Sequence, residues 1–276
     1  MLHQNSITKG YAQTQLGQIH YLHTPASAGL PTLVLLHQTP SSGEMFRPLM
    51  QLLANDFYCI APDFIGFGNS DPVPDQYGGT HSVALYANSV WLCLQQLQVQ
   101  APVLFGHHTG VAVAAQLEHE HPGFCHQLIF SGPTLLSDTQ KQALPAAVVD
   151  ASLDEQGDFM QRYWQKIRGK DSNVPLQLSL RECLLALRLG DSYKKAYQAV
   201  AKQDFAAQIA AIQCPTLVFA GERDVLHAMV APTVALLPLG QAANIGDAST
   251  YVCETHSKQL AQLIRQFCNT ANPAIQ

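Results

Sequence analysis

The chain has 276 residues, 47% of them apolar, and a formal net charge of −5 at pH 7, a size that suits one large α/β domain with an insertion. The N-terminus lacks the basic and apolar segments of an export signal, no stretch approaches the ~20 apolar residues of a membrane span, and no basic cluster offers a surface for nucleic acid. Seven cysteines without paired spacing favour reduced thiols and a cytoplasmic location.

Strand and helix patterns alternate through the first half of the chain. Two short segments flank Gly17 and predict an N-terminal hairpin. Later apolar runs without alternation are typical of strands covered on both faces, and apolar residues at helical spacing separate them. The predicted strands are 11–16, 18–22, 32–36, 57–61, 103–105 and 127–131, and the predicted helices are 44–54 and 82–97 together with the segment that begins at residue 111.

The alternation stops after Gly132 and resumes near residue 204. We therefore predict an α/β fold with a mostly parallel, doubly wound sheet, whose core is formed by residues 1–132 and 204–276. Residues 133–203 are predicted to form a helical lid, and ligands of such sheets bind at the carboxyl ends of the strands. The later predicted helices are 135–149, 159–167, 178–189, 193–200 and 257–268, and the later strands are 216–220 and 241–245.

A turn of five residues, Gly106-His107-His108-Thr109-Gly110, joins a strand of small and apolar residues to a helix of small residues. The glycines stand two residues either side of the centre, as in the G-x-S-x-G nucleophile elbow. Such a turn is strained, and strand and helix pass so close that side chains at the glycine positions would collide. The central residue is His108, so the frame of an elbow is present without its serine.

Four segments in order give the chain its resemblance to a known family. They are Leu35-Leu36-His37-Gln38, the glycine-rich turn Asp63–Asp71, the elbow, and Phe219–Asp224. With this spacing around a helical insertion, the chain resembles the α/β-hydrolase superfamily, and within it a subgroup with His-Gln-Thr-Pro and Gly-His-His-Thr-Gly segments. The resemblance implies the α/β-hydrolase fold and places Asp224 where the family carries the acid of its catalytic triad.

The triad histidine expected before the last helix is missing. Alignment on Gly246 puts Asp247 in its place, whereas alignment on Glu254 puts Ser249 there. We prefer the second alignment, which suggests that serine and histidine have exchanged places and that Ser249 lies within about 4 Å of a nitrogen of His108. In that arrangement Asp224 lies beside Ser249. The first alignment instead predicts Asp247 beside His108.

The remaining site residues receive roles from the same resemblance. We predict His108 as a general base on water or on an acidic substrate proton, and the N–H groups of Gln38 and Thr109 as oxyanion donors. His37 and His107 are interpreted as structural. The histidine spacing matches no metal-binding motif, so we expect neither metal nor other cofactor.

The expected activity is hydrolysis of a small apolar ester or related carbonyl compound. The alternatives are a lyase that uses His108 as its base and a ligand-binding protein that has kept the pocket without catalysis. In each case the expected partner is a small molecule, without nucleic acid or membrane, and the chain is expected to be a monomer or homodimer.

Overall fold

The computed structural model describes residues 6–27, 29–150 and 152–270, and its centre is one eight-stranded sheet. Residues 1–5, on which the expected absence of an export signal partly rests, lie outside this description. The strands are β1 (Thr8–Thr14), β2 (Gly17–His23), β3 (Thr32–Leu36), β4 (Tyr58–Pro62), β5 (Val103–His107), β6 (Gln127–Ser131), β7 (Thr216–Phe219) and β8 (Gly240–Ala242).

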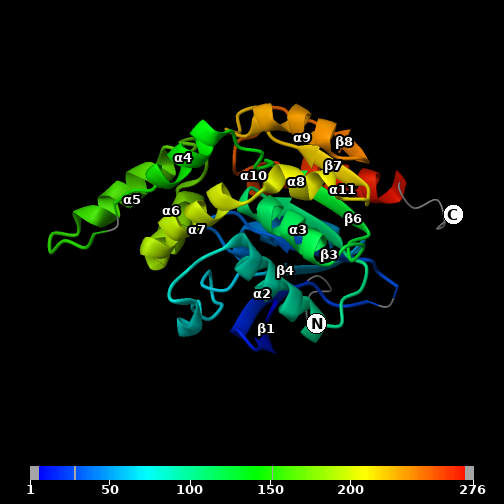
Figure 1. Ribbon diagram of the computed structural model, residues 1–276, viewed down its shortest axis with the longest axis horizontal. Helices are drawn as coiled ribbons and strands as arrows, with labels where there is room; N and C mark the ends of the chain where they lie inside the picture. Colours follow the sequence, from blue (N-terminus) through cyan, green and yellow to red (C-terminus); the bar gives the residue numbers. More distant parts are fainter. Residues whose placement is uncertain (1–5, 28, 151, 271–276) are drawn as a thin grey trace.

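The sheet has the order β1-β2-β4-β3-β5-β6-β7-β8. β1 pairs antiparallel with β2 and β2 with β4, whereas all pairs from β4 to β8 are parallel. The predicted N-terminal hairpin and the mostly parallel sheet are therefore confirmed (Figure 1). The last strand is shorter than predicted: beyond Ala242, pairing with the β7 side is reduced to a hydrogen bond from the Ala243 N–H to the Val218 carbonyl and an isolated bridge between Ile245 and Gly221.

Helices cover both faces of the sheet, as predicted. They are α1 (Arg47–Leu53), α2 (Val83–Gln96), α3 (Thr109–Glu120), α8 (Phe205–Ala210), α9 (Val230–Leu236), α10 (Val252–Thr255) and α11 (Ser257–Thr270). Among the described helices, none has the length and apolar character that crossing a bilayer requires.

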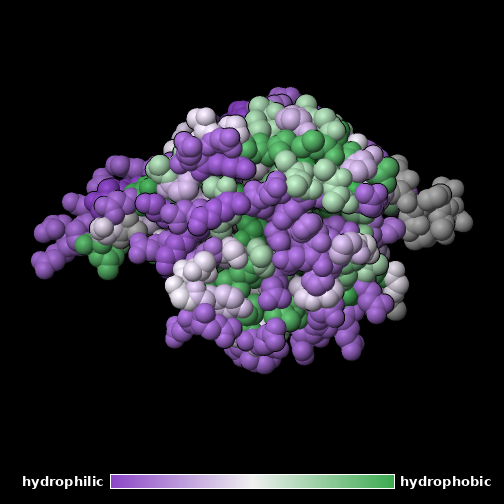
Figure 2. Space-filling model, viewed as in Figure 1, coloured by the Kyte–Doolittle hydropathy of each residue, from purple (hydrophilic) through white to green (hydrophobic). Residues whose placement is uncertain are grey.

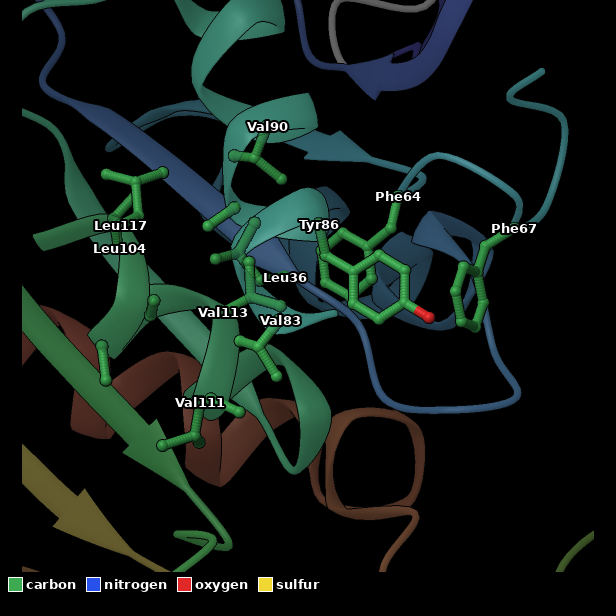
Figure 3. Packing of buried hydrophobic residues seen from close by; sticks show 14 of the residues in the cluster. Leu36, Phe64, Phe67, Val83, Tyr86, Val90, Leu104, Val111, Val113 and Leu117 are labelled. Carbon is green, nitrogen blue, oxygen red and sulfur yellow. The ribbon is translucent and has the colours of Figure 1, made fainter. Parts of the chain in front are cut away.

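Alternate side chains of each central strand build two separate cores. In β3, Val34 and Leu36 pack with α2 and α3, whereas Leu33 and Leu35 pack with α1 and α11. Successive side chains of a strand point to opposite faces, so a strand covered on both sides reads as an unbroken apolar run. Figure 3 shows the first core, in which Tyr86 of α2 stacks on a phenylalanine of the turn after β4.

Four helices lie between β6 and α8, and the described residues of this segment form no strand. They are α4 (Asp138–Ala146), α5 (Asp158–Arg168), α6 (Leu176–Leu189) and α7 (Asp191–Lys202). α4 begins later than predicted, because Ser137 caps it: its hydroxyl accepts from the Gln140 N–H, and the Gln140 side chain accepts from the Ser137 N–H. α4, α5 and α6 extend away from the sheet in Figure 1, and hydrophilic side chains cover most of this arm in Figure 2.

Candidate functional site

The turn between β5 and α3 has the predicted strained geometry. His108 adopts φ 50° and ψ −111°, a conformation that residues with a side chain rarely take. A Cβ at Gly110 would lie 2.0 Å from the Leu36 carbonyl oxygen, and one at Gly106 would lie 2.4 Å from the Gly110 carbonyl oxygen. Strand and helix therefore approach too closely for any side chain at the two glycines.

The imidazole of His108 pairs directly with the carboxylate of Asp224. The distance from His108 Nε2 to Asp224 Oδ2 is 2.8 Å, and the Asp224 side chain is only 1% exposed. Gly132, at the end of β6, makes room for the ring, since a Cβ there would lie 2.4 Å from His108 Cδ2. The other carboxylate oxygen, Oδ1, accepts the N–H of Leu226 at 2.8 Å.

The charge of Asp224 fixes where the protons of this pair reside. Burial alone would raise the pKa of the Asp224 carboxyl, but the adjoining His108 and its hydrogen bond outweigh burial, and His107 and the Leu226 N–H add to their effect, so the pKa is lowered. An ionised carboxylate can only accept, so Nε2 of His108 carries the proton that it donates. In the neutral ring Nδ1 then holds a lone pair, and none of the described residues hydrogen-bonds to that atom.

His107 is a buried, neutral bridge beside this pair. Its Nε2–H donates to the Thr250 carbonyl at 2.8 Å, which leaves Nδ1 to accept from the Ser131 hydroxyl at 2.9 Å. Burial lowers the pKa of His107 to about 3, and the nearby His108 contributes to this lowering. The His107 ring therefore joins β6 to the loop before α10 without adding a charge.

The side chains around His108 could in principle bind a metal ion instead of forming hydrogen bonds. One ligand atom each from His107, His108 and Asp224 lie within 4.8 Å of one another. Both nitrogens of His107 are already hydrogen-bonded, so coordination would require Ser131 or Thr250 to give up its bond. We therefore interpret the three side chains as hydrogen-bonding groups, His108 with Asp224 and His107 with Ser131 and Thr250.

Two further predicted residues lie after β3. His37 donates from Nδ1 to the Gln38 carbonyl at 2.8 Å and accepts the Phe64 N–H on Nε2 at 3.1 Å, and burial lowers its pKa. Both ring nitrogens of His37 are therefore hydrogen-bonded to backbone groups, one at Gln38 and one at Phe64. The Gln38 amide oxygen accepts from the Thr250 hydroxyl at 3.1 Å, which ties this turn to the loop before α10.

The two predicted partners of His108 lie elsewhere. Asp247 beside His108 is wrong: the Asp247 side chain is 87% exposed and pairs with Arg223 at 2.9 Å. The predicted bond between Ser249 and His108 is not formed among the described residues. Ser249 is buried next to Asp171. Burial raises the pKa of the Asp171 carboxyl, and a hydrogen bond with the Ser249 side chain lowers it. The Ser249 hydroxyl oxygen also accepts the Tyr251 N–H at 3.5 Å. His108 is longer than serine and reaches Asp224 by itself, which leaves no gap for a third residue.

A cavity of about 110 Å³ opens beside His108. Its polar wall carries Thr39, Thr109 and Thr134, whereas its other walls are mostly apolar. Leu144 of α4 and Tyr197 of α7 close it from the inserted helices. The remaining lining residues are Leu136, Val200, Val225 and Leu226.

Comparison with known proteins identifies the family and the fold of the chain. The family model described as alpha/beta hydrolase fold matches residues 31–181, which is more than half of the chain. The chain belongs to this family. An uncharacterized hydrolase of Saccharomyces cerevisiae is 34% identical over 110 residues, 40% of this chain and 37% of that protein. A haloalkane dehalogenase of Bradyrhizobium diazoefficiens is 31% identical over 100 residues, 36% of this chain and 31% of that protein.

These matches span only about a third of the length of the curated relatives. Likeness of fold extends much further. A thermophilic esterase from Thermogutta terrifontis superposes with a TM-score of 0.77 at 20% identity, covering 96% of this chain and 99% of the other. The α/β-hydrolase fold is thus shared over nearly the whole chain.

Sequence reasoning missed two features of this α/β-hydrolase site. Gly132 is a glycine directly after a predicted strand, at the sheet edge where ligands bind, and that placement could have singled it out. The direct pairing of His108 with Asp224 had a signal as well, because both residues follow parallel strands and end at the same edge.

Proposed function

We propose that the chain is a hydrolase of small esters or related carbonyl compounds in which His108 acts as general base and Asp224 orients it. The observation that carries the proposal is the bond of 2.8 Å between His108 Nε2 and Asp224 Oδ2, made from the elbow at the edge of a cavity. A carboxylate that holds one imidazole nitrogen protonated leaves the other nitrogen free to take a proton.

The reaction starts from a water molecule between His108 Nδ1 and the carbonyl carbon. Nδ1 takes a proton while the water oxygen bonds to that carbon, and the carbonyl oxygen becomes an oxyanion. The oxyanion accepts from the N–H groups of Thr109 and Gln38. Thr109 is the first residue of α3, so its N–H has no carbonyl one turn earlier. The tetrahedral intermediate then collapses, and the imidazolium returns the proton to the leaving oxygen.

The inserted segment, residues 133–203, is proposed as the lid over this site, with residues 1–132 and 204–276 as the core. Leu144 and Tyr197 line the cavity from the lid side, which supports that role. The apolar walls favour a small substrate with an uncharged carbonyl group. A volume of about 110 Å³ is close to that of an engineered cavity of ~150 Å³ known to hold benzene, so we expect short acyl chains.

The test is turnover of p-nitrophenyl acetate and butyrate by the wild type, His108→Ala and Ser249→Ala. We expect His108→Ala to lose at least about a hundredfold in kcat, in the range usual for a general base. Ser249→Ala is the matched control, since its hydroxyl faces Asp171, and it should keep wild-type turnover. Equal rates for the wild type and His108→Ala would overturn the proposal and favour a ligand-binding protein.

Absence of a covalent intermediate is the second readout. A general base that acts on water forms no acyl-enzyme, so we expect no initial burst and no protein adduct after exposure to an organophosphonate. Mass spectrometry of the treated protein reports any adduct. A labelled serine or threonine would show that the reaction proceeds through a side-chain nucleophile.

A further inference from the structure

Two threonine hydroxyls form a pair on the polar wall of the cavity. The Thr109 and Thr39 Oγ1 atoms are 3.1 Å apart, and Thr109 Oγ1 also accepts the Thr39 N–H at 3.3 Å. Thr39 is 3% exposed and Thr109 4% exposed, and both line the cavity together with His108. The pair is therefore shielded from bulk water and placed where a substrate binds.

Counting protons shows that this pair holds one donor in surplus. Each hydroxyl has one proton, and the bond between the two oxygens uses one of them, whichever oxygen donates. The described residues offer no other acceptor to either hydroxyl. A buried donor without an acceptor is unfavourable, so an acceptor in the cavity is favoured.

The positions of the two residues place this surplus donor near the reacting carbonyl. Thr109 also carries one of the N–H groups proposed as oxyanion donors, and Thr39 directly follows Gln38, which carries the other. We propose that the Thr39–Thr109 hydroxyl pair is a third hydrogen-bond donor to the carbonyl oxygen of the substrate and to the oxyanion formed from it. This inference rests on the proposed function for its catalytic consequence and on the cavity alone for its binding consequence.

The hydroxyl count makes an unusual prediction for valine variants. Thr39→Val frees the Thr109 proton for the ligand, and Thr109→Val leaves the Thr39 proton free, so each single variant keeps one donor. We expect the double variant to lose at least about tenfold more in kcat than either single variant, with little change in KM, because an oxyanion donor acts mainly in the transition state. Thr39→Ser/Thr109→Ser keeps both hydroxyls and should restore kcat.

A binding measurement tests the donor without turnover. Infrared spectroscopy of 3-methyl-2-butanone bound to the protein reports hydrogen bonding to its carbonyl as a lowered stretching frequency. We expect the lowered band in the wild type, in both single variants and in the double serine variant. In the double valine variant the band should move back toward its value in an apolar solvent.

The outcomes separate the two proposals. If the band responds as expected but no ester is hydrolysed, the donor pair stands and the proposed hydrolysis fails. If esters are hydrolysed but the band is the same in the wild type and the double valine variant, or is unshifted in both, the donor pair is refuted. Additive losses in the two single valine variants would refute it as well, because they would mean that each hydroxyl acts alone.

Discussion

Replacement of Asp224 by asparagine tests the proton arrangement of the site most directly. Asp224 accepts two hydrogen bonds of 2.8 Å, from the Leu226 N–H on Oδ1 and from His108 Nε2 on Oδ2. An amide of the same shape has one oxygen and one NH₂ group for these two places. If the oxygen faced His108, the NH₂ group would meet the Leu226 N–H donor to donor, in a place sealed from water.

In Asp224→Asn the amide oxygen therefore faces Leu226, and the NH₂ group faces His108 Nε2. Nε2 must then accept, so the ring proton moves to Nδ1 and the lone pair needed for catalysis is lost. The same substitution in a Ser-His-Asp protease lowers kcat about 10⁴-fold for this reason. We expect a loss of about 10³- to 10⁴-fold, equivalent to roughly 4–5 kcal/mol of activation free energy.

Asp224→Ala is the discriminating control. Alanine leaves Nε2 without a partner, so the neutral ring of His108 can still place its lone pair on Nδ1 for part of the time. We therefore expect Asp224→Ala to be at least about tenfold more active than Asp224→Asn, although it removes more atoms. The assay is kcat on p-nitrophenyl acetate, and ¹⁵N shifts of labelled histidine report the tautomer. Activity of the asparagine variant equal to or above that of the alanine variant would refute the reasoning.

Two further predictions concern packing and pH. Gly132→Ala should abolish most activity, because a Cβ would lie 2.6 Å from His108 Nε2 and push the ring away from Asp224. Measurements of kcat and of thermal unfolding check this prediction. A variant that keeps the wild-type kcat would contradict it. Burial raises the pKa of Glu254 to about 7, and Glu182 adds to this against the opposing effect of Arg181. Between about pH 4.5 and 7 the folded state then binds more protons than the unfolded state. The free energy of unfolding is therefore highest below pH 4.5 as far as Glu254 is concerned, and it falls by up to about 3 kcal/mol as the pH rises to 7. Urea unfolding of the wild type and Glu254→Gln should show this difference in slope, and parallel pH profiles would contradict it.

Local patterns predicted the architecture well because the fold depends on them. The unbroken apolar run at residues 32–36 follows from burial of β3 on both faces, and the glycines of the elbow follow from the 2.0 Å approach of a Gly110 Cβ to the backbone. Both are requirements of one short segment, so the sequence of that segment reveals them. The ends of α4 and β8 were less accurate, because capping by Ser137 and pairing at a sheet edge decide them.

The partner of His108 could not be taken from alignment. Both alignments assumed that the partner of His108 comes from the loop before α10, as in a triad whose elbow carries a short side chain. The choice between Asp247 and Ser249 was therefore a choice between two residues that do not pair with His108. Side-chain length was the neglected quantity, since an imidazole at the elbow reaches the Asp224 carboxylate directly, at 2.8 Å.

Because His108 replaces the serine of the elbow, the loop before α10 has a different role in this chain. In a triad with the usual order, that loop supplies the base. Here its Thr250 carbonyl accepts from His107 and its Thr250 hydroxyl donates to Gln38, so it braces the two turns on either side of the cavity. In the proposed mechanism the base stands on the elbow, in the place of a side-chain nucleophile, and the reacting atom is Nδ1 of His108. A site built in this way has to use a nucleophile that enters with the substrate, and water is the one that a hydrolase requires. This is why the asparagine and alanine variants of Asp224, which differ in the tautomer that they allow, are the sharpest test of the proposed chemistry.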